Sequence, residues 1–186
     1  MIEVEIKLPL FRRSMMEKSL RNLGFLPGDL VKESDLYFTG DTHDFMKTDE
    51  ALRIRTCDNM TTCSSVSYLT YKGPKLDNIS NTRKELETEI KDAQTAREIL
   101  IALGYQKLYP VTKLRQYYHM ERVTACVDLV EGLGAFLELE ILVESSDKKE
   151  AALRQIENIL QQLGSSMKET TRKSYLSMLL SKDSLC

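Results

Sequence analysis

Residues 1–8, MIEVEIKL, are the stretch that decides the fold. Glu3, Glu5 and Lys7 alternate with apolar residues, and successive side chains of a β-strand point to opposite faces. The three charges therefore share one face of a predicted strand, and the apolar groups share the other. Taken alone, this pattern is typical of a half-buried strand whose charged face meets solvent. The interpretation changes because the same arrangement recurs at distant places in the chain.

The recurrence is a set of predicted strands that carry charge on one face. Strands are predicted at 1–8, 34–38, 51–57, 66–72, 82–90, 111–121, 123–130 and 135–143. Their charged faces contain Glu3, Glu5, Lys7, Arg53, Arg55, Lys72, Arg83, Glu85, Glu87, Lys113, Arg115, Asp128, Glu138 and Glu140. In most of these strands the opposite face is apolar, as with Leu52 and Ile54.

Helices are predicted between the strands. Helical periodicity covers 12–23, 93–103 and a segment from Asp147 to Leu163, and each ends at a Leu-Gly pair. Asp92 and Asp147 are the predicted N-caps of the second and third helices. A last helix is predicted at 172–180.

The charged faces could coat a barrel or converge inside it, and the helices favour the second arrangement. Amphipathic helices need an apolar surface, and the apolar strand faces are the partner large enough to supply it. A lumen of mixed charge requires a ligand, because each unpaired buried ion costs several kcal/mol. Arginine and lysine side chains are suited to a polyphosphate, and carboxylates are suited to divalent ions that bridge phosphate oxygens.

Length and composition limit the number of domains, the partners and the kind of metal site that the chain can have. The 186 residues predict one domain spanning 1–186. With 26 basic against 28 acidic residues, no long-range field attracts nucleic acid or an anionic membrane. The absence of a signal-peptide pattern or an apolar span predicts a cytoplasmic protein. Cys57, Cys63, Cys126 and Cys186 lack metal-site spacing, so we expect free thiols and, for any metal, a hard ion on carboxylates.

These residues carry a family resemblance. EVEIK, DLYF, LRIR, TYKGP, TRKELE, VTKLRQYY, VDLVEGLGAFLELEI and RKSY resemble, in order, the motifs of the CYTH superfamily, the triphosphate tunnel metalloenzymes. YKGP, KLRQYY and GLGAFLELE are most similar to the class IV adenylyl cyclase branch. The resemblance implies an α+β fold in which an eight-stranded antiparallel β-barrel forms a tunnel with helices packed on its outside.

The resemblance also implies roles for individual residues. Mg²⁺ or Mn²⁺ would be bound by Glu3, Glu5, Asp128, Glu138 and Glu140. The triphosphate would be held by Lys7, Arg53, Arg55, Lys72, Arg83, Lys113, Arg115 and Lys173, with Arg172 as a competing candidate for the last position. Lys7, Lys72 and Arg115 would be catalytic. Glu85 and Glu87 would either bind metal or orient Arg83 by pairing with it.

Two reactions fit such a tunnel, with ATP or another triphosphate as the partner. The resemblance favours a cyclase that converts ATP to cyclic AMP and pyrophosphate. The alternatives are hydrolysis of inorganic triphosphate or thiamine triphosphate, and a non-catalytic polyphosphate- or nucleotide-binding module. A homodimer is compatible with the resemblance.

Overall fold

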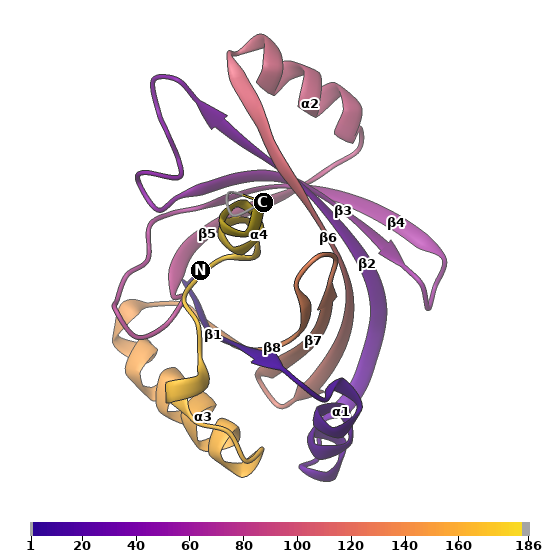
Figure 1. The fold of residues 1–186 in the computed structure, drawn as a ribbon, viewed down its shortest axis with the longest axis vertical. Helices are drawn as coiled ribbons and strands as arrows, with labels where there is room; N and C mark the ends of the chain where they lie inside the picture. Colours follow the sequence, from indigo (N-terminus) through magenta and orange to yellow (C-terminus); the bar gives the residue numbers. More distant parts are fainter. Residues whose placement is uncertain (1, 184–186) are drawn as a thin grey trace.

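Eight antiparallel strands close into a barrel in the order β1-β5-β4-β3-β2-β6-β7-β8 (Figure 1). The structure is a computed structural model that describes residues 2–183. Its strands are β1 (Ile2–Leu10), β2 (Leu26–Gly40), β3 (Ala51–Asn59), β4 (Ser64–Lys72), β5 (Arg83–Ile90), β6 (Tyr105–Met120), β7 (Val123–Val130) and β8 (Gly134–Val143). The predicted eight-stranded barrel is confirmed.

The helices lie around this barrel. They are α1 (Arg13–Asn22), α2 (Ala93–Ala102), α3 (Lys149–Gln162) and α4 (Tyr175–Asp183), with short 3-10 turns at η1 (Ser146–Lys148) and η2 (Met167–Glu169). The α+β class with helices outside the barrel is confirmed. Within residues 2–183, no helix has the length and apolarity needed to cross a membrane.

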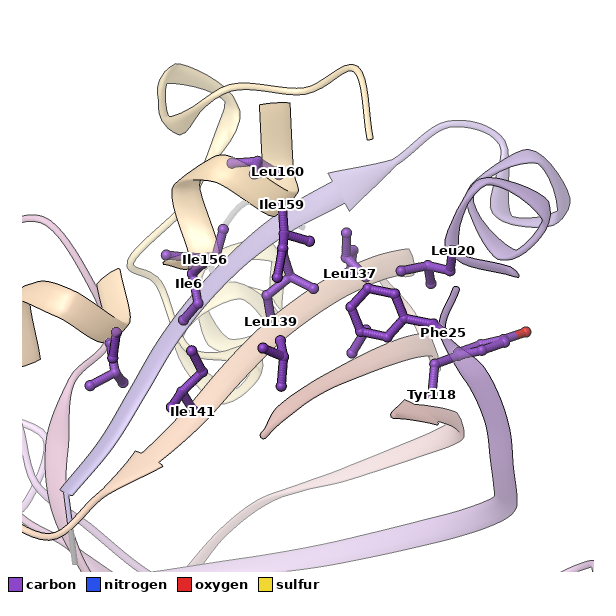
Figure 2. Close-up of a cluster of buried hydrophobic side chains, with 14 of the residues drawn as sticks. Ile6, Leu20, Phe25, Tyr118, Leu137, Leu139, Ile141, Ile156, Ile159 and Leu160 are labelled. Atoms are coloured by element: carbon purple, nitrogen blue, oxygen red, sulfur yellow. The ribbon is translucent and has the colours of Figure 1, made fainter. Parts of the chain in front are cut away.

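The largest core cluster lies between the barrel wall and the helices (Figure 2). On the strand side, the apolar residues of β1 and β8, such as Ile6 and Leu139, are almost fully buried. On the helix side, α3 contributes Ile156 and Leu160, and α1 contributes Leu20. Because β1 side chains alternate, this packing turns the charged face of the strand away from the helices and toward the barrel interior.

A second cluster joins α2 to the neighbouring wall, where Leu100 packs with Phe38 of β2 and Ile54 of β3. The α4 helix is placed differently. It packs through Tyr175 and Leu176 onto Val111 and Phe136, which lie on the same strand faces as the charged residues of β6 and β8. Helix α4 therefore covers one end of the barrel interior.

Several predicted boundaries require correction. The strand predicted at 34–38 is part of the longer β2, and the strand predicted at 111–121 begins at Tyr105, because long barrel strands extend beyond their apolar alternation. Asp92 caps α2 by accepting a hydrogen bond from the Thr95 amide at 2.9 Å, as predicted.

The third helix was expected to be capped by Asp147, which instead lies inside the η1 turn that precedes α3. The last helix starts at Tyr175 and not at Arg172. Among the described cysteines, Cys57, Cys63 and Cys126 are free thiols, and Cys186 lies outside the described residues.

Candidate functional site

A cavity of about 470 Å³ occupies the barrel interior. Charged side chains from the barrel strands and from the segment after η2 line it. The predicted site residues among its lining are Glu3, Glu5, Lys7, Arg53, Arg55, Lys72, Arg83, Lys113, Arg115, Glu138, Glu140 and Lys173. Of the predicted set, Asp128 does not line the cavity in the part of the chain that the structure describes.

Strand register explains why these residues meet. In the β1–β8 pair, Glu5 lies opposite Glu140 and Lys7 lies opposite Glu138. The barrel closes where Glu3 of β1 lies opposite Arg83 of β5. Residues directly opposite each other on neighbouring strands have adjacent side chains on the same face. Register therefore gathers carboxylates and cations that are far apart in the sequence.

One group of ion pairs connects β1 with its neighbours. Lys72 Nζ lies 2.6 Å from Glu3 Oε2 and 3.2 Å from Glu85 Oε2. Lys7 Nζ lies 3.0 Å from Glu138 Oε1 and 3.6 Å from Glu5 Oε1. These side chains are at least four-fifths buried, so solvent screens the pairs only weakly.

A second group depends on two carboxylates that sequence reasoning did not place in the site. The buried Asp35 forms two parallel hydrogen bonds with Arg55, Nε to Oδ1 at 2.6 Å and Nη2 to Oδ2 at 2.7 Å. Glu33 Oε2 lies 2.8 Å from both Arg55 Nη1 and Lys113 Nζ. Glu33 and Asp35 share one face of β2, but the residues beside Glu33 are Lys32 and Ser34, so no apolar alternation marks the pair in the sequence. The predicted strand began one residue too late to include Glu33.

Asp128 lies behind Arg115. Its two oxygens accept from Arg115 Nε at 2.7 Å and Nη2 at 2.6 Å, and Oδ2 also accepts from the Tyr175 hydroxyl at 2.9 Å. Arg115 Nη2 also donates to Glu138. This arrangement orients the Arg115 guanidinium at the cavity wall, and it commits both Asp128 oxygens to protein donors.

The carboxylates of β1 and β8 differ in their electrostatics. Burial raises the pKa of Glu3, but Lys72 outweighs it and brings that pKa to about 2. Burial and the Glu138 charge raise the pKa of Glu5. Burial, followed by the charges of Glu3 and Glu5, raises the pKa of Glu140 to about 8. Burial and neighbouring carboxylates therefore both disfavour the charged forms of Glu5 and Glu140.

The carboxylates of β1 and β8 decide whether a divalent ion fits the cavity. Within residues 2–183, no three His, Cys, Asp or Glu side chains already converge as a preformed metal site. The donors present are carboxylate oxygens, the ligand type that Mg²⁺ and Mn²⁺ prefer. Because Glu5 and Glu140 are opposite each other and repel, a cation between them would relieve the repulsion. The donor set fits a hard divalent ion.

The two unassigned carboxylates of β5 have separate partners. Glu85 pairs with Lys72 and lies 3.9 Å from Arg53 Nη2. Glu87 accepts a hydrogen bond from Thr70 at 2.7 Å. The hypothesis that one of them pairs with Arg83 has no support in these contacts, because Arg83 donates instead to Asp49 and to the Gly73 carbonyl.

Both candidates for the basic position near the chain's end line the cavity. Arg172 donates to the backbone carbonyls of Ser80 at 3.2 Å and Asp77 at 2.7 Å, whereas the Lys173 side chain is exposed. Asn81, which the prediction did not include, donates to Glu5 Oε1 at 3.2 Å. These contacts depend on loop positions that strand periodicity does not reveal.

Comparison with known proteins supplies the family. The CYTH domain model matches residues 1–175. The chain belongs to the CYTH family. A Methanocaldococcus jannaschii protein provisionally named an adenylate cyclase is 41% identical over 178 residues, which cover 96% of this CYTH chain and 98% of that protein.

Two further relatives agree with this assignment. The adenylate cyclase CyaB of Aeromonas hydrophila is 27% identical over 144 residues, which cover 77% of this CYTH chain and 70% of that protein. A solved structure from Pyrococcus horikoshii is 39% identical with a TM-score of 0.89, and the alignment covers 97% and 99% of the two chains. The fold is therefore shared with the P. horikoshii structure along nearly the whole chain.

Proposed function

We propose that this CYTH chain is a metal-dependent adenylyl cyclase that converts ATP to cyclic AMP and pyrophosphate inside the barrel. The observation that carries the proposal is a cavity in the barrel interior whose wall holds both a set of cations and a group of crowded carboxylates. Cations are suited to a triphosphate, and carboxylates are suited to its divalent ion. The adenylate cyclase names of two relatives support the choice of ATP.

In the proposed reaction, the 3′-hydroxyl oxygen of the ribose attacks the α-phosphorus, pyrophosphate leaves, and the hydroxyl proton passes to solvent. Phosphoryl chemistry of this kind depends mainly on positioning and charge neutralisation. Lys7, Lys72 and Arg115 are the proposed catalytic cations, because each lines the cavity and is buried or, for Lys72, mostly buried. They would stabilise negative charge on the reacting phosphate and on the departing pyrophosphate.

Ligand binding would exchange ion-pair partners within the lumen. Lys72 and Lys7 now neutralise Glu3 and Glu138, and an incoming triphosphate would take over both lysines. The released carboxylates, together with Glu5 and Glu140, would then hold Mg²⁺ or Mn²⁺, which supplies Lewis-acid polarisation of the phosphate oxygens. Because Asp128 is committed to Arg115, we assign it to orienting that guanidinium and not to the metal.

The remaining predicted cations would complete the triphosphate site. Arg53, Arg55 and Lys113 line the cavity from β3 and β6, and Arg53 Nε has no hydrogen-bond partner among residues 2–183. The guanidinium and ammonium groups of these three residues are suited to phosphate oxygens. Apolar groups also line the cavity, among them Tyr37, Phe45 and Met46. They favour a nucleotide over a bare triphosphate, because a base needs such surface.

The test is turnover by the purified chain with Mg²⁺ or Mn²⁺ and, separately, ATP, inorganic triphosphate and thiamine triphosphate. Equal amounts of cyclic AMP and pyrophosphate from ATP are expected. Orthophosphate from inorganic triphosphate or thiamine triphosphate, without cyclic AMP from ATP, would replace the cyclase with a hydrolase. Tight triphosphate binding without turnover of any substrate would leave a binding module.

A further inference from the structure

The Asp49 carboxylate pairs with two cations, Lys75 and Arg83, at the cavity wall. Asp49 Oδ1 lies 2.6 Å from Lys75 Nζ and 3.1 Å from Arg83 Nη2. Its other oxygen, Oδ2, accepts from the Lys75 backbone amide at 3.1 Å. Arg83 Nη1 also donates to the Asp49 carbonyl at 2.7 Å. All three residues line the cavity, so the pairing lies inside the proposed site.

The surroundings of this carboxylate are strongly basic. Arg172 also lines the cavity. Its side chain donates to the backbone carbonyls of Ser80 and Asp77, and these neutral acceptors do not cancel its positive charge. Burial, followed by the positive charge of Arg83 and then of Arg172, lowers the pKa of Lys75. Asp49 therefore occupies a position where Lys75 and Arg83 create positive potential, and a phosphate would be stabilised at the same position.

Asp49 is also able to leave this position. Its side chain is 47% exposed, whereas those of Lys75 and Arg83 are 13% and 11% exposed. Asp49 lies at the end of the loop between β2 and β3, so its carboxylate can turn to water without disturbing a strand. A half-exposed ion pair is weak, and a polyphosphate brings more negative charge than one carboxylate.

We propose that Lys75 and Arg83 form an outer phosphate-binding subsite, and that Asp49 occupies it in the free protein as an intramolecular competitor. A polyphosphate ligand displaces Asp49 and takes over both cations. When the polyphosphate product leaves, the carboxylate returns. The inference rests on the proposed function, because it assumes that the cavity binds a polyphosphate. It adds Lys75 to the binding residues and gives Asp49 a role that opposes binding.

The experiment is calorimetric titration of inorganic triphosphate into wild-type protein and Asp49→Asn, with EDTA present so that no turnover interferes. Asparagine tolerates the left-handed backbone of residue 49, whose φ is 56°, so the substitution removes charge with little strain. We expect Asp49→Asn to bind triphosphate about fivefold more tightly, the size of effect that a weak competing ion pair produces. Asp41→Asn, a charge change in the same loop outside the cavity lining, should stay within about twofold of wild type.

Lys75→Gln tests the proposed subsite independently of Asp49→Asn. It should weaken triphosphate binding about fivefold, and in that background Asp49→Asn should change the affinity less than about twofold, because the two residues act through one contact. Unchanged or weaker binding by a folded Asp49→Asn protein would overturn the inference while leaving the proposed function intact. If Asp49→Asn unfolds, unchanged binding by Lys75→Gln would overturn it. Failure of the wild-type protein to bind triphosphate would overturn both.

Discussion

Glu33→Gln removes one negative charge from a fully buried position on β2. The Glu33 side chain is 1% exposed and lies between Arg55 and Lys113, with Oε2 at 2.8 Å from each. Its other oxygen accepts from the Tyr117 hydroxyl at 2.9 Å. Glutamine preserves the shape but removes the negative charge that lies between the two buried cations. Breaking a buried ion pair from one side costs about 3–5 kcal/mol.

The lower end of that range applies here, because the glutamine oxygen still accepts hydrogen bonds and Asp35 still neutralises Arg55. For a chain of 186 residues, 1 kcal/mol lowers the melting temperature by about 2–4 °C. A loss of about 3 kcal/mol therefore predicts a fall of roughly 6–12 °C by circular dichroism. Glu144→Gln, at an 82% exposed side chain, is the matched control and should melt within about 2 °C of wild type.

The pH dependence of the same variant tests the cause. Burial raises the pKa of Glu33, but Arg55 and Lys113 outweigh it and hold that pKa well below the ordinary value of 4.5. A group with a lowered folded-state pKa stabilises the fold above its unfolded-state pKa and loses that contribution as the pH falls. The deficit of Glu33→Gln should therefore be full at pH 7 and shrink below about pH 4.5. A melting temperature equal to wild type at pH 7 would refute the reasoning.

Two further predictions distinguish the residues needed for activity from those needed for stability. Glu138→Gln, which removes a carboxylate from Lys7 and Arg115, should lower metal-dependent turnover about 10- to 100-fold, and retained turnover would contradict the metal assignment. Leu139→Ala, on the opposite face of β8, should lower the free energy of unfolding by about 2–5 kcal/mol in chemical denaturation. Its dissociation constant for inorganic triphosphate should stay within about twofold of wild type, whereas a larger change would show that the two faces are not independent.

The arrangement of the barrel could be predicted from the sequence because strand alternation and helix periodicity agree. Ile6 had to face a helix if Glu5 faced the lumen, and Ile6 packs in the cluster to which α3 contributes. Register could not be predicted in the same way. That Glu5 lies opposite Glu140 follows from pairing between distant strands, which single-strand patterns do not determine.

The missed residues have physical reasons. Glu33 and Asp35 share one face of β2, but unlike Glu3 and Glu5, Glu33 is flanked by polar residues, Lys32 and Ser34, so the strand lacks the apolar alternation that marks β1. Lys75 and Asp49 lie in two loops whose contact depends on how the loops cross the barrel edge, and loop composition carries no such information.

The central claim is that one lumen binds a triphosphate on its cations and a divalent ion on its carboxylates. A crystal structure with Mn²⁺ and inorganic triphosphate tests it most directly, because manganese is located by its anomalous signal. We predict the manganese signal in contact with Glu5 and Glu140, and phosphate oxygens on Lys72 and Arg53. Triphosphate bound outside the barrel, with Lys72 still paired to Glu3, would contradict the claim.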